Sequence, residues 1–253
     1  MSVRWTLRFL GTGSAQAVEL GNSAGVIECD SRPLLLIDCG QHAIERYFAV
    51  YGAPPPALFL THLHLDHVGG LEWLFQRLWF NAAWRGRTRV YVPAAIVPLL
   101  QARVADFPNV LAEGGVNFWD AFQLIPTSRG FWCEGWWFEV FANRHHRPGT
   151  SFGLALPGAL VWTGDTRPIP EVLAVHAARG ERIAHDCGVI GNPSHTGLDD
   201  LAREYSPELR ARLVLYHYGS AADGKALAQA GYRVAKPGDV IGLTAPQLSA
   251  DAG

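Results

Sequence analysis

Short apolar runs separated by glycine, proline and polar residues dominate the first half of the chain, and this pattern predicts β-strands. Strands are expected at Trp5–Leu10, Ala24–Glu28, Pro33–Ile37, Ala57–Leu60 and Arg89–Val92. The apolar period changes to that of a helix in three places, which are Gln41–Tyr51, the segment after His67 with Leu71, Leu74, Phe75 and Leu78 on one face, and Ala95–Val104.

The second half alternates strands with helices. Phe118–Phe141 is rich in tryptophan and is broken at Pro126 and Gly135, so consecutive strands are expected there. The later elements are a hairpin of Leu154–Leu156 and Leu160–Trp162, helices at Glu171–Ala178, Leu198–Tyr205 (with Thr196 and Asp199 spaced as a capping box) and Asp223–Ala230, strands at Arg182–Ala184 and Leu213–Tyr216, and a final hairpin at Lys236-Pro237-Gly238. This order fits two packed sheets with helices on their outer faces.

The composition indicates one compact domain. The 253 residues are 49% hydrophobic and 17% charged, and they contain neither an internal repeat nor a low-complexity tract. The absence of a linker predicts a single domain over residues 1–245, followed by a C-terminal tail at 246–253.

Charge and cysteine usage exclude several classes of protein. A net charge of -2 and a pI of about 6.5 provide no general attraction to a nucleic-acid backbone. The four cysteines show no C-x-x-C spacing, so neither a disulfide framework nor a cysteine zinc site is expected. Arg4 and Arg8 interrupt the apolar N-terminus, and no run reaches the roughly 18 apolar residues of a membrane span. A cytoplasmic protein without a membrane partner is therefore expected.

The segment Thr61–Gly70 reads THLHLDHVGG and follows a strand that should be buried. On a strand His62 and His64 would share one face, while Asp66 and His67 would lie in the turn that enters the next helix. Desolvating such side chains is costly unless something binds them, and imidazole with carboxylate suits zinc, manganese or iron. One ion would be crowded by this set, whereas two adjacent ions would use every member.

Further candidate ligands follow other predicted strands. The pair His145 and His146 comes after Phe138–Ala142, Asp165 comes just after Trp162, and His217 ends the strand Leu213–Tyr216. The ends of strands are where α/β proteins gather functional side chains. We therefore expect these residues to converge with the histidine segment.

The segment Thr61–Gly70, together with Phe9–Ser14 (FLGTGS), Ile37–Gly40 (IDCG) and Thr163–Thr166 (TGDT), resembles the metallo-β-lactamase-fold hydrolases. Within them the chain is most similar to the branch of ribonuclease Z and its phosphodiesterase relatives. The similarity runs from about Leu7 to Ile241. It implies an α/β fold that is a four-layer αβ/βα sandwich of two mixed β-sheets with helices on the outer faces.

The resemblance also implies a ligand set for two divalent metal ions, zinc in the first place and manganese or iron as alternatives. One ion would be bound by His62, His64 and His146, the other by Asp66, His67 and His217, with Asp165 bridging both. The adjacent His145 is the alternative to His146, and the distance to the sequence Ser151-Phe152-Gly153 favours His146.

The implied reaction is hydrolysis by a hydroxide that bridges the two ions, with Asp66 counted among the catalytic residues. The stretches around Asp186 and His195 resemble the acid and histidine pair of the family, so His195 is expected to protonate the leaving group while Asp186 orients it. Asp38 is expected to support the ligand histidines from behind.

The substrate implied is a small or short single-stranded phosphodiester. Ribonuclease Z enzymes carry a long inserted arm for tRNA, but here only Arg147–Gly164 separates the histidine pair from Asp165, so a structured tRNA is not expected. Two alternatives stay open. One is hydrolysis of a carboxylic ester, thioester or lactone in a pocket built from Phe118–Phe141, and the other is a non-catalytic, metal-dependent small-ligand binding protein. The tryptophan-rich strands also leave a homodimer open.

Overall fold

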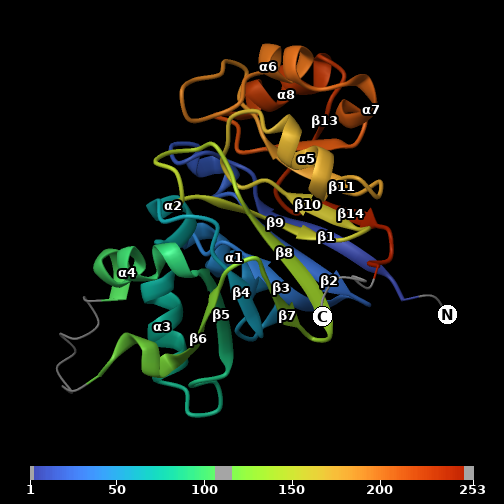
Figure 1. Ribbon diagram of the computed structural model, residues 1–253. Helices are drawn as coiled ribbons and strands as arrows, with labels where there is room; N and C mark the ends of the chain where they lie inside the picture. Colours follow the sequence, from blue (N-terminus) through green and yellow to red (C-terminus); the bar gives the residue numbers. More distant parts are fainter. Residues whose placement is uncertain (1–2, 106–115, 248–253) are drawn as a thin grey trace.

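Two seven-stranded sheets pack face to face in the computed structural model, which describes residues 3–105 and 116–247 (Figure 1). The first sheet has the order β14 (Val240–Leu243), β1 (Trp5–Gly11), β2 (Ala24–Cys29), β3 (Arg32–Ile37), β4 (Ala57–Phe59), β5 (Thr88–Pro93), β6 (Phe122–Thr127). The second has the order β13 (Arg233–Val234), β12 (Leu213–Tyr216), β11 (Arg182–Asp186), β10 (Leu160–Trp162), β9 (Phe152–Leu156), β8 (Trp136–Ala142), β7 (Gly130–Cys133). Each sheet contains both antiparallel and parallel pairs, so both are mixed.

Helices cover the outer face of each sheet (Figure 1). Those on the first sheet are α1 (Gln41–Tyr51), α2 (Leu65–Val68), α3 (Leu71–Trp79) and α4 (Val97–Leu100). Those on the second sheet are α5 (Pro170–His176), α6 (Leu198–Glu204), α7 (Pro207–Arg210) and α8 (Ala221–Gln229). Short 3₁₀ segments occur at Val18–Leu20, Ala94–Ile96 and Phe118–Ala121, and one π-helical turn at Gln101–Ala105. The predicted four-layer α/β sandwich is thereby confirmed.

Alternation along the strands creates the layers. In β4 the side chain of Phe59 enters the core between the sheets, whereas Leu58 packs under the helices of the first sheet. Leu7 and Phe9 of β1 likewise enter the central core, where Trp162 of the second sheet packs against Phe9 with ring centroids 5.7 Å apart. Successive side chains of a strand point to opposite faces, so one set packs between the sheets and the other packs under the helices, and both faces of each sheet are buried.

The predicted C-terminal hairpin is wrong. β13 pairs with β12 in the second sheet, whereas β14 pairs with β1 in the first. The turn itself forms, because the amide of Asp239 donates to the carbonyl of Lys236, but the chain uses it to cross between sheets. Turn residues identify the reversal without identifying which strands it connects.

Three other segments also differ from the prediction. Phe118–Ala121 is a 3₁₀ turn, and Pro126 lies inside β6 instead of breaking it. A proline is tolerated there because β6 is an edge strand. The helix predicted at Ala95–Val104 is divided into short helical pieces. The cap of α6 is Gly197, whose amide donates to Asp200, not the predicted pair of Thr196 and Asp199.

The end of β3 is packed closely against the histidine segment. A side chain at Gly40 would place its Cβ 2.0 Å from the carbonyl oxygen of Asp66, so only glycine fits between them. The amide of Cys39 donates to the carbonyl of His67, and the amide of Gly70 donates to Cys39 in return. These contacts fix the histidine segment against the first sheet.

Candidate metal centre

The histidine segment is an extended loop and the first turn of α2, not the end of a strand. β4 ends at Phe59, so His62 and His64 lie in the loop, and Asp66 and His67 lie in α2. The extended backbone still places the two loop histidines side by side, with His62 Nε2 3.1 Å from His64 Nδ1. His62 and His64 therefore lie together as predicted, although they belong to a loop and not to a strand.

Asp165, just beyond the end of β10, occupies the middle of the cluster. Its side chain is 1% exposed, and its Oδ2 atom approaches the Nε2 atoms of several histidines. The distances are 3.1 Å to His217, 3.3 Å to His67, 3.7 Å to His62 and 3.9 Å to His145. One carboxylate therefore contacts side chains from both sheets.

The clustered atoms divide into two groups that share Asp165. The first is His62, His64, His145 and Asp165, and the second is Asp66, His67, Asp165 and His217. Within each group the potential ligand atoms all lie within 4.8 Å of one another. Each group offers four imidazole and carboxylate donors, counting the shared Asp165, which is the number and type that a zinc, manganese or iron ion binds.

The structure places His145, and not the predicted His146, in the first group. His145 is 3% exposed and its Nε2 lies 3.2 Å from His64 Nδ1, on the inner side of that ring. The exposed His146 instead contacts the outer nitrogen of His64, with Nε2 to Nε2 at 2.9 Å. Spacing to the next strand favoured His146, but the loop after β8 turns its first histidine inward and its second outward.

Replacing either histidine of the pair with alanine should separate their roles. His145→Ala should weaken binding of one metal ion by about 100-fold or more, since a direct ligand is lost, whereas His146→Ala should weaken it by about tenfold at most. Metal titration of the two variants, monitored by calorimetry, measures the difference. An equal loss of metal affinity in the two variants, or a larger loss in His146→Ala, would contradict the placement of His145.

Hydrogen bonds behind the cluster orient its histidines. The Nδ1 atom of His145 donates to the carbonyl of Ser194 at 3.0 Å, and that of His67 to Asp38 at 2.8 Å. Nδ1 of His62 lies 3.0 Å from the hydroxyl of Thr61, which itself donates to Asp38. Because each Nδ1 carries the proton, each Nε2 presents its lone pair to the cluster.

Asp38 supports the cluster in the way the sequence predicted, whereas Thr61 was missed. The threonine directly precedes the histidine segment, and its own amide also donates to Asp38 at 2.8 Å. Asp38 and His217 adopt left-handed backbone conformations, with φ of 64° and 66°. Such strain in residues other than glycine is concentrated at functional sites, where the surrounding structure enforces it.

Several buried polar atoms of the cluster form no hydrogen bond within residues 3–105 and 116–247. They are Nε2 of His67, Nε2 of His217, both carboxylate oxygens of Asp165 and Oδ1 of Asp186. Burying such atoms without a hydrogen bond costs free energy, and bound cations would satisfy those of His67, His217 and Asp165. The donor set contains no thiolate, which is the chemistry of a reactive rather than a structural metal site. The residues therefore fit a pair of divalent cations.

The electrostatics of the cluster favour cation binding. Burial lowers the pKa of His62 well below its usual value and that of His145 to about 4, so both rings are neutral at pH 7. Burial opposes the ionisation of Asp165, but His217 and His67 outweigh it and hold its pKa well below the usual range. The ionised Asp165 and the neutral rings of His62 and His145 are ready ligands for a metal ion. Although burial opposes it, Asp165 raises the pKa of His67 and of His217, so a cation bound there would replace protons.

Asp186, the last residue of β11, joins the metal cluster to His195. Its Oδ2 accepts a hydrogen bond from Nδ1 of His195 at 2.8 Å, and its Oδ1 lies 3.4 Å from Nδ1 of His217. Burial alone would lower the pKa of His195, but the hydrogen bond to Asp186 raises it above the usual value. The rings of His195 and His217 stack with centroids 5.0 Å apart. The predicted acid and histidine pair is thus assembled beside the cluster.

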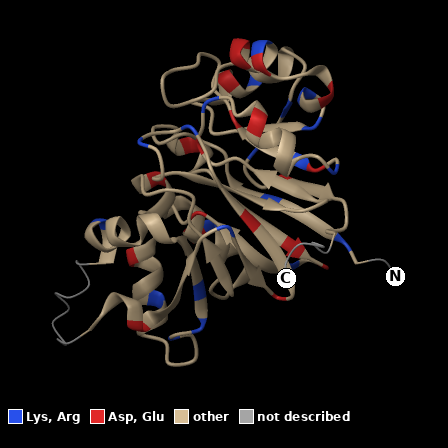
Figure 2. Ribbon diagram, in the orientation of Figure 1, with Lys and Arg blue, Asp and Glu red and all other residues tan. Residues whose placement is uncertain are grey.

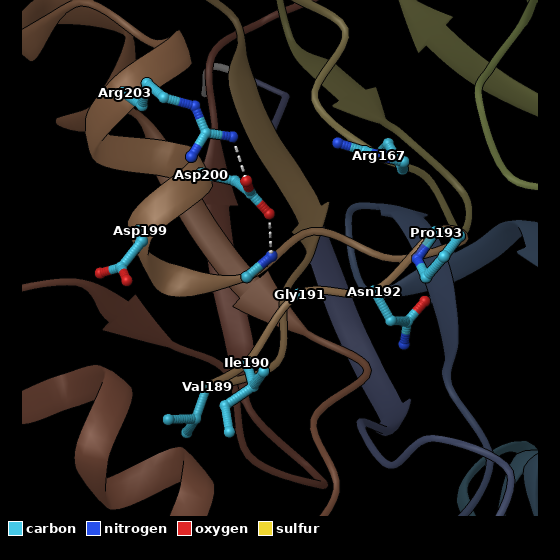
Figure 3. Close-up of a pocket in the computed structure, with 10 residues that line it drawn as sticks. Arg167, Val189, Ile190, Gly191, Asn192, Pro193, Asp199, Asp200 and Arg203 are labelled. Atoms are coloured by element: carbon cyan, nitrogen blue, oxygen red, sulfur yellow. Dashed lines mark hydrogen bonds and ion pairs between the residues drawn. The ribbon is translucent and has the colours of Figure 1, made fainter.

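An open cavity of about 370 Å³ adjoins these residues. It is lined by Ser14, Asp186, Gly188, Val189, Ile190, Asn192, His195, His217, Gly219 and Asp223. The loop Gly188–Asn192 also contributes to the lining of a second cavity of about 440 Å³, in which Arg167 lies opposite Arg203 and Asp200 of α6 (Figure 3). The first cavity is the one in contact with the candidate metal centre.

Comparisons with known proteins agree with this geometry. The family model described as Anti-Pycsar protein Apyc1 matches residues 5–241. Anti-Pycsar protein Apyc1 of Paenibacillus xerothermodurans is 30% identical over 225 residues, covering 84% of this chain and 87% of that protein. Ribonuclease TTHA0252 of Thermus thermophilus is 33% identical over 172 residues, covering 63% of this chain but only 38% of the ribonuclease.

The fold also matches solved structures. The metallo-β-lactamase-fold protein YhfI from Bacillus subtilis superposes with a TM-score of 0.73 over 94% of this chain and 99% of that chain, at 13% identity. The family resemblance read from the histidine segment is therefore confirmed. Among the described residues, none of the helices is both long and apolar enough to span a membrane.

Proposed function

This chain belongs to the Anti-Pycsar protein Apyc1 family of metal-dependent hydrolases with the metallo-β-lactamase fold, and on that premise we propose that it is a dinuclear phosphodiesterase acting on a small phosphodiester. The relative named as a ribonuclease supports a phosphodiester as the bond that is hydrolysed. The observation that carries the proposal is the position of the Asp165 carboxylate between the two histidine groups. Its Oδ2 lies 3.7 Å from Nε2 of His62 in one group and 3.1 Å from Nε2 of His217 in the other.

The two groups that share Asp165 would hold the cations, with His62, His64 and His145 on one side and Asp66, His67 and His217 on the other. Bound divalent cations would supply Lewis-acid chemistry, which lowers the pKa of water and offsets the charge developing on phosphoryl oxygens. Zinc is the first candidate because the donors are chiefly imidazoles, with manganese and iron as alternatives.

His195 is positioned to donate a proton to the leaving oxygen. Its Nδ1 is held by Asp186, and its ring lines the cavity, so Nε2 is the nitrogen left for the substrate. The raised pKa keeps a larger fraction of the ring protonated near neutral pH, as a general acid requires. Asp186 fixes the ring and stabilises its positive charge.

The surroundings favour a small substrate. Basic and acidic residues occur in both halves of the described chain (Figure 2), and the net charge of -2 provides no general attraction to a structured RNA. A cavity of about 370 Å³ has room for a mononucleotide-sized group. A 3′,5′-cyclic nucleotide or a short single-stranded diester is therefore the substrate that we propose, and a structured tRNA is not.

The ester, thioester or lactone alternative loses its structural support. None of the ten residues that line the cavity comes from the aromatic stretch Phe118–Phe141. Phe118 packs under the helices of the first sheet, and Phe131 and Phe138 pack between the sheets. The buried aromatic side chains of the stretch therefore belong to the core, whereas Trp132 is 48% exposed on the edge strand β7. This exposed tryptophan leaves the proposal of a homodimer open.

The proposal predicts which bonds the enzyme hydrolyses. The protein loaded with zinc or manganese should hydrolyse bis(p-nitrophenyl) phosphate and a 3′,5′-cyclic nucleotide. It should not accelerate the hydrolysis of p-nitrophenyl acetate above the rate seen without enzyme. Release of p-nitrophenolate, and chromatography of the nucleotide, measure the two activities. Turnover of the acetate with neither phosphodiester hydrolysed, in either metal, would contradict the proposed function.

A further inference from the structure

Asp223 brings to the cavity a carboxylate that neither the metal cluster nor the fold uses. It lies in the first turn of α8, yet the helix is capped by Ser220, whose Oγ accepts from the amide of Asp223 at 3.1 Å. The carboxylate forms no hydrogen bond or ion pair within the described residues. Its Oδ2 lies beside Gly219, where an added Cβ would be 2.8 Å away, and both residues line the cavity.

No described side chain that lines the cavity pairs with the carboxylate of Asp223. Asp186 also lines it, but that carboxylate is already engaged by His195 and His217. No lysine or arginine is among the ten lining residues. An anion-binding cavity would be expected to exclude a free carboxylate, so Asp223 must face a part of the substrate other than its phosphoryl group.

Apolar side chains accompany this carboxylate. Val189 and Ile190 lie on the loop that borders the cavity, and Ile190 is 85% exposed. A large aliphatic side chain held in solvent at the rim offers a surface for the flat face of a ring. The cavity thus combines one edge of the candidate metal centre, at His217, with an apolar rim and a hydrogen-bond acceptor.

We propose that Asp223 is a specificity-determining residue, whose carboxylate accepts hydrogen bonds from hydroxyl or amino groups on the neutral part of the substrate and repels a second anionic group. The inference rests on the proposed phosphodiesterase function and defines the substrate class more narrowly. The class is a phosphodiester with a single negative charge, joined to a nucleoside or similar group that carries hydrogen-bond donors. A nucleotide with an additional terminal phosphate is selected against.

The first test compares two substrates that release the same leaving group. They are the p-nitrophenyl ester of thymidine 5′-monophosphate, which carries a sugar hydroxyl, and bis(p-nitrophenyl) phosphate, which carries no donor. In metal-loaded Asp223→Asn the ratio of their kcat/KM values should fall about tenfold, chiefly through KM, because a charged acceptor is replaced by a neutral one. The matched control is Asp199→Asn, which changes an exposed acid in the first turn of α6 and should keep the wild-type ratio.

The second test adds charge. Wild-type enzyme should discriminate against the same thymidine ester bearing a 3′-phosphate, and Asp223→Asn should reduce that discrimination by about tenfold. The inference would be overturned if, in both tests, the ratio of the kcat/KM values of the two substrates in Asp223→Asn lay within twofold of the wild-type ratio.

A binding measurement separates this inference from the proposed function. Calorimetry with a slowly hydrolysed phosphorothioate diester of thymidine should give a Kd about tenfold weaker for Asp223→Asn than for wild type. If the wild-type enzyme hydrolyses no phosphodiester, the proposed function is contradicted. The role of Asp223 is then decided by binding alone, and a Kd for Asp223→Asn equal to that of wild type overturns it.

Discussion

Replacing Asp165 with asparagine should remove at least one metal ion from the protein and lower kcat/KM for a phosphodiester by about 10³-fold or more. Both candidate ligand groups depend on this carboxylate, whose Oδ2 lies 3.1 Å from His217 and 3.7 Å from His62. Asparagine keeps the shape of the side chain but removes the charge that compensates two cations. The loss should therefore exceed that caused by changing a ligand of only one ion.

Metal content per chain and steady-state kinetics measure this effect together. The control is Asp199→Asn, an equally conservative change on the exposed surface of α6, which should keep both metal ions and full activity. Circular dichroism of both variants distinguishes metal loss from unfolding. An Asp165→Asn protein that retains two ions and wild-type activity would show that this carboxylate does not bridge them.

Replacing His195 with alanine should lower kcat for hydrolysis of a 3′,5′-cyclic nucleotide by about 10²- to 10³-fold, because an alkoxide leaving group needs a proton. The loss should be about tenfold or less for bis(p-nitrophenyl) phosphate, whose leaving group is stable as an anion. The metal content should be unchanged, since His195 belongs to neither of the two groups that share Asp165. A larger loss for the activated substrate would contradict the role of general acid.

The same residue predicts a pH dependence. The hydrogen bond to Asp186 raises the pKa of His195 despite its burial, so the protonated, active form predominates below that raised pKa. Hydrolysis of the cyclic nucleotide should therefore fall as the pH rises through it, and His195→Ala should lack this alkaline decline. His176→Ala is a suitable control, because that histidine, at the end of α5, pairs with Glu139 of β8 and does not line the cavity. It should keep the wild-type profile.

The proximity of most candidate ligands could be predicted from the sequence because most of them are local. His62, His64, Asp66 and His67 lie within six positions, so their proximity does not depend on knowing the topology. Asp165 and His217 were identified because each directly follows an apolar strand, and strand ends of parallel neighbours meet at one edge. The two-sheet architecture followed from the same alternation of apolar runs.

What could not be predicted depends on loop conformation and on pairing between distant segments. Nothing in the sequence determines which of His145 and His146 turns inward, because the direction is set by the loop after β8 and by the carbonyl of Ser194. The turn at Lys236–Gly238 is visible in the sequence, yet the sheet that each flanking strand joins is not.

Asp223 could not be recognised for a different reason. An acidic residue in the first turn of a helix is ordinarily a favourable partner for the helix dipole, which is an adequate explanation from sequence alone. Only the structure shows that Ser220 caps the helix and that the Asp223 carboxylate lines the same cavity as His195.

A crystal structure of the metal-loaded protein, with anomalous diffraction recorded at the absorption edge of the bound metal, tests the central claim most directly. The account predicts two anomalous peaks about 3.5–4 Å apart, with the Asp165 carboxylate between them, His145 at one and His217 at the other. A single peak, or two peaks with Asp165 bound to neither, would contradict it.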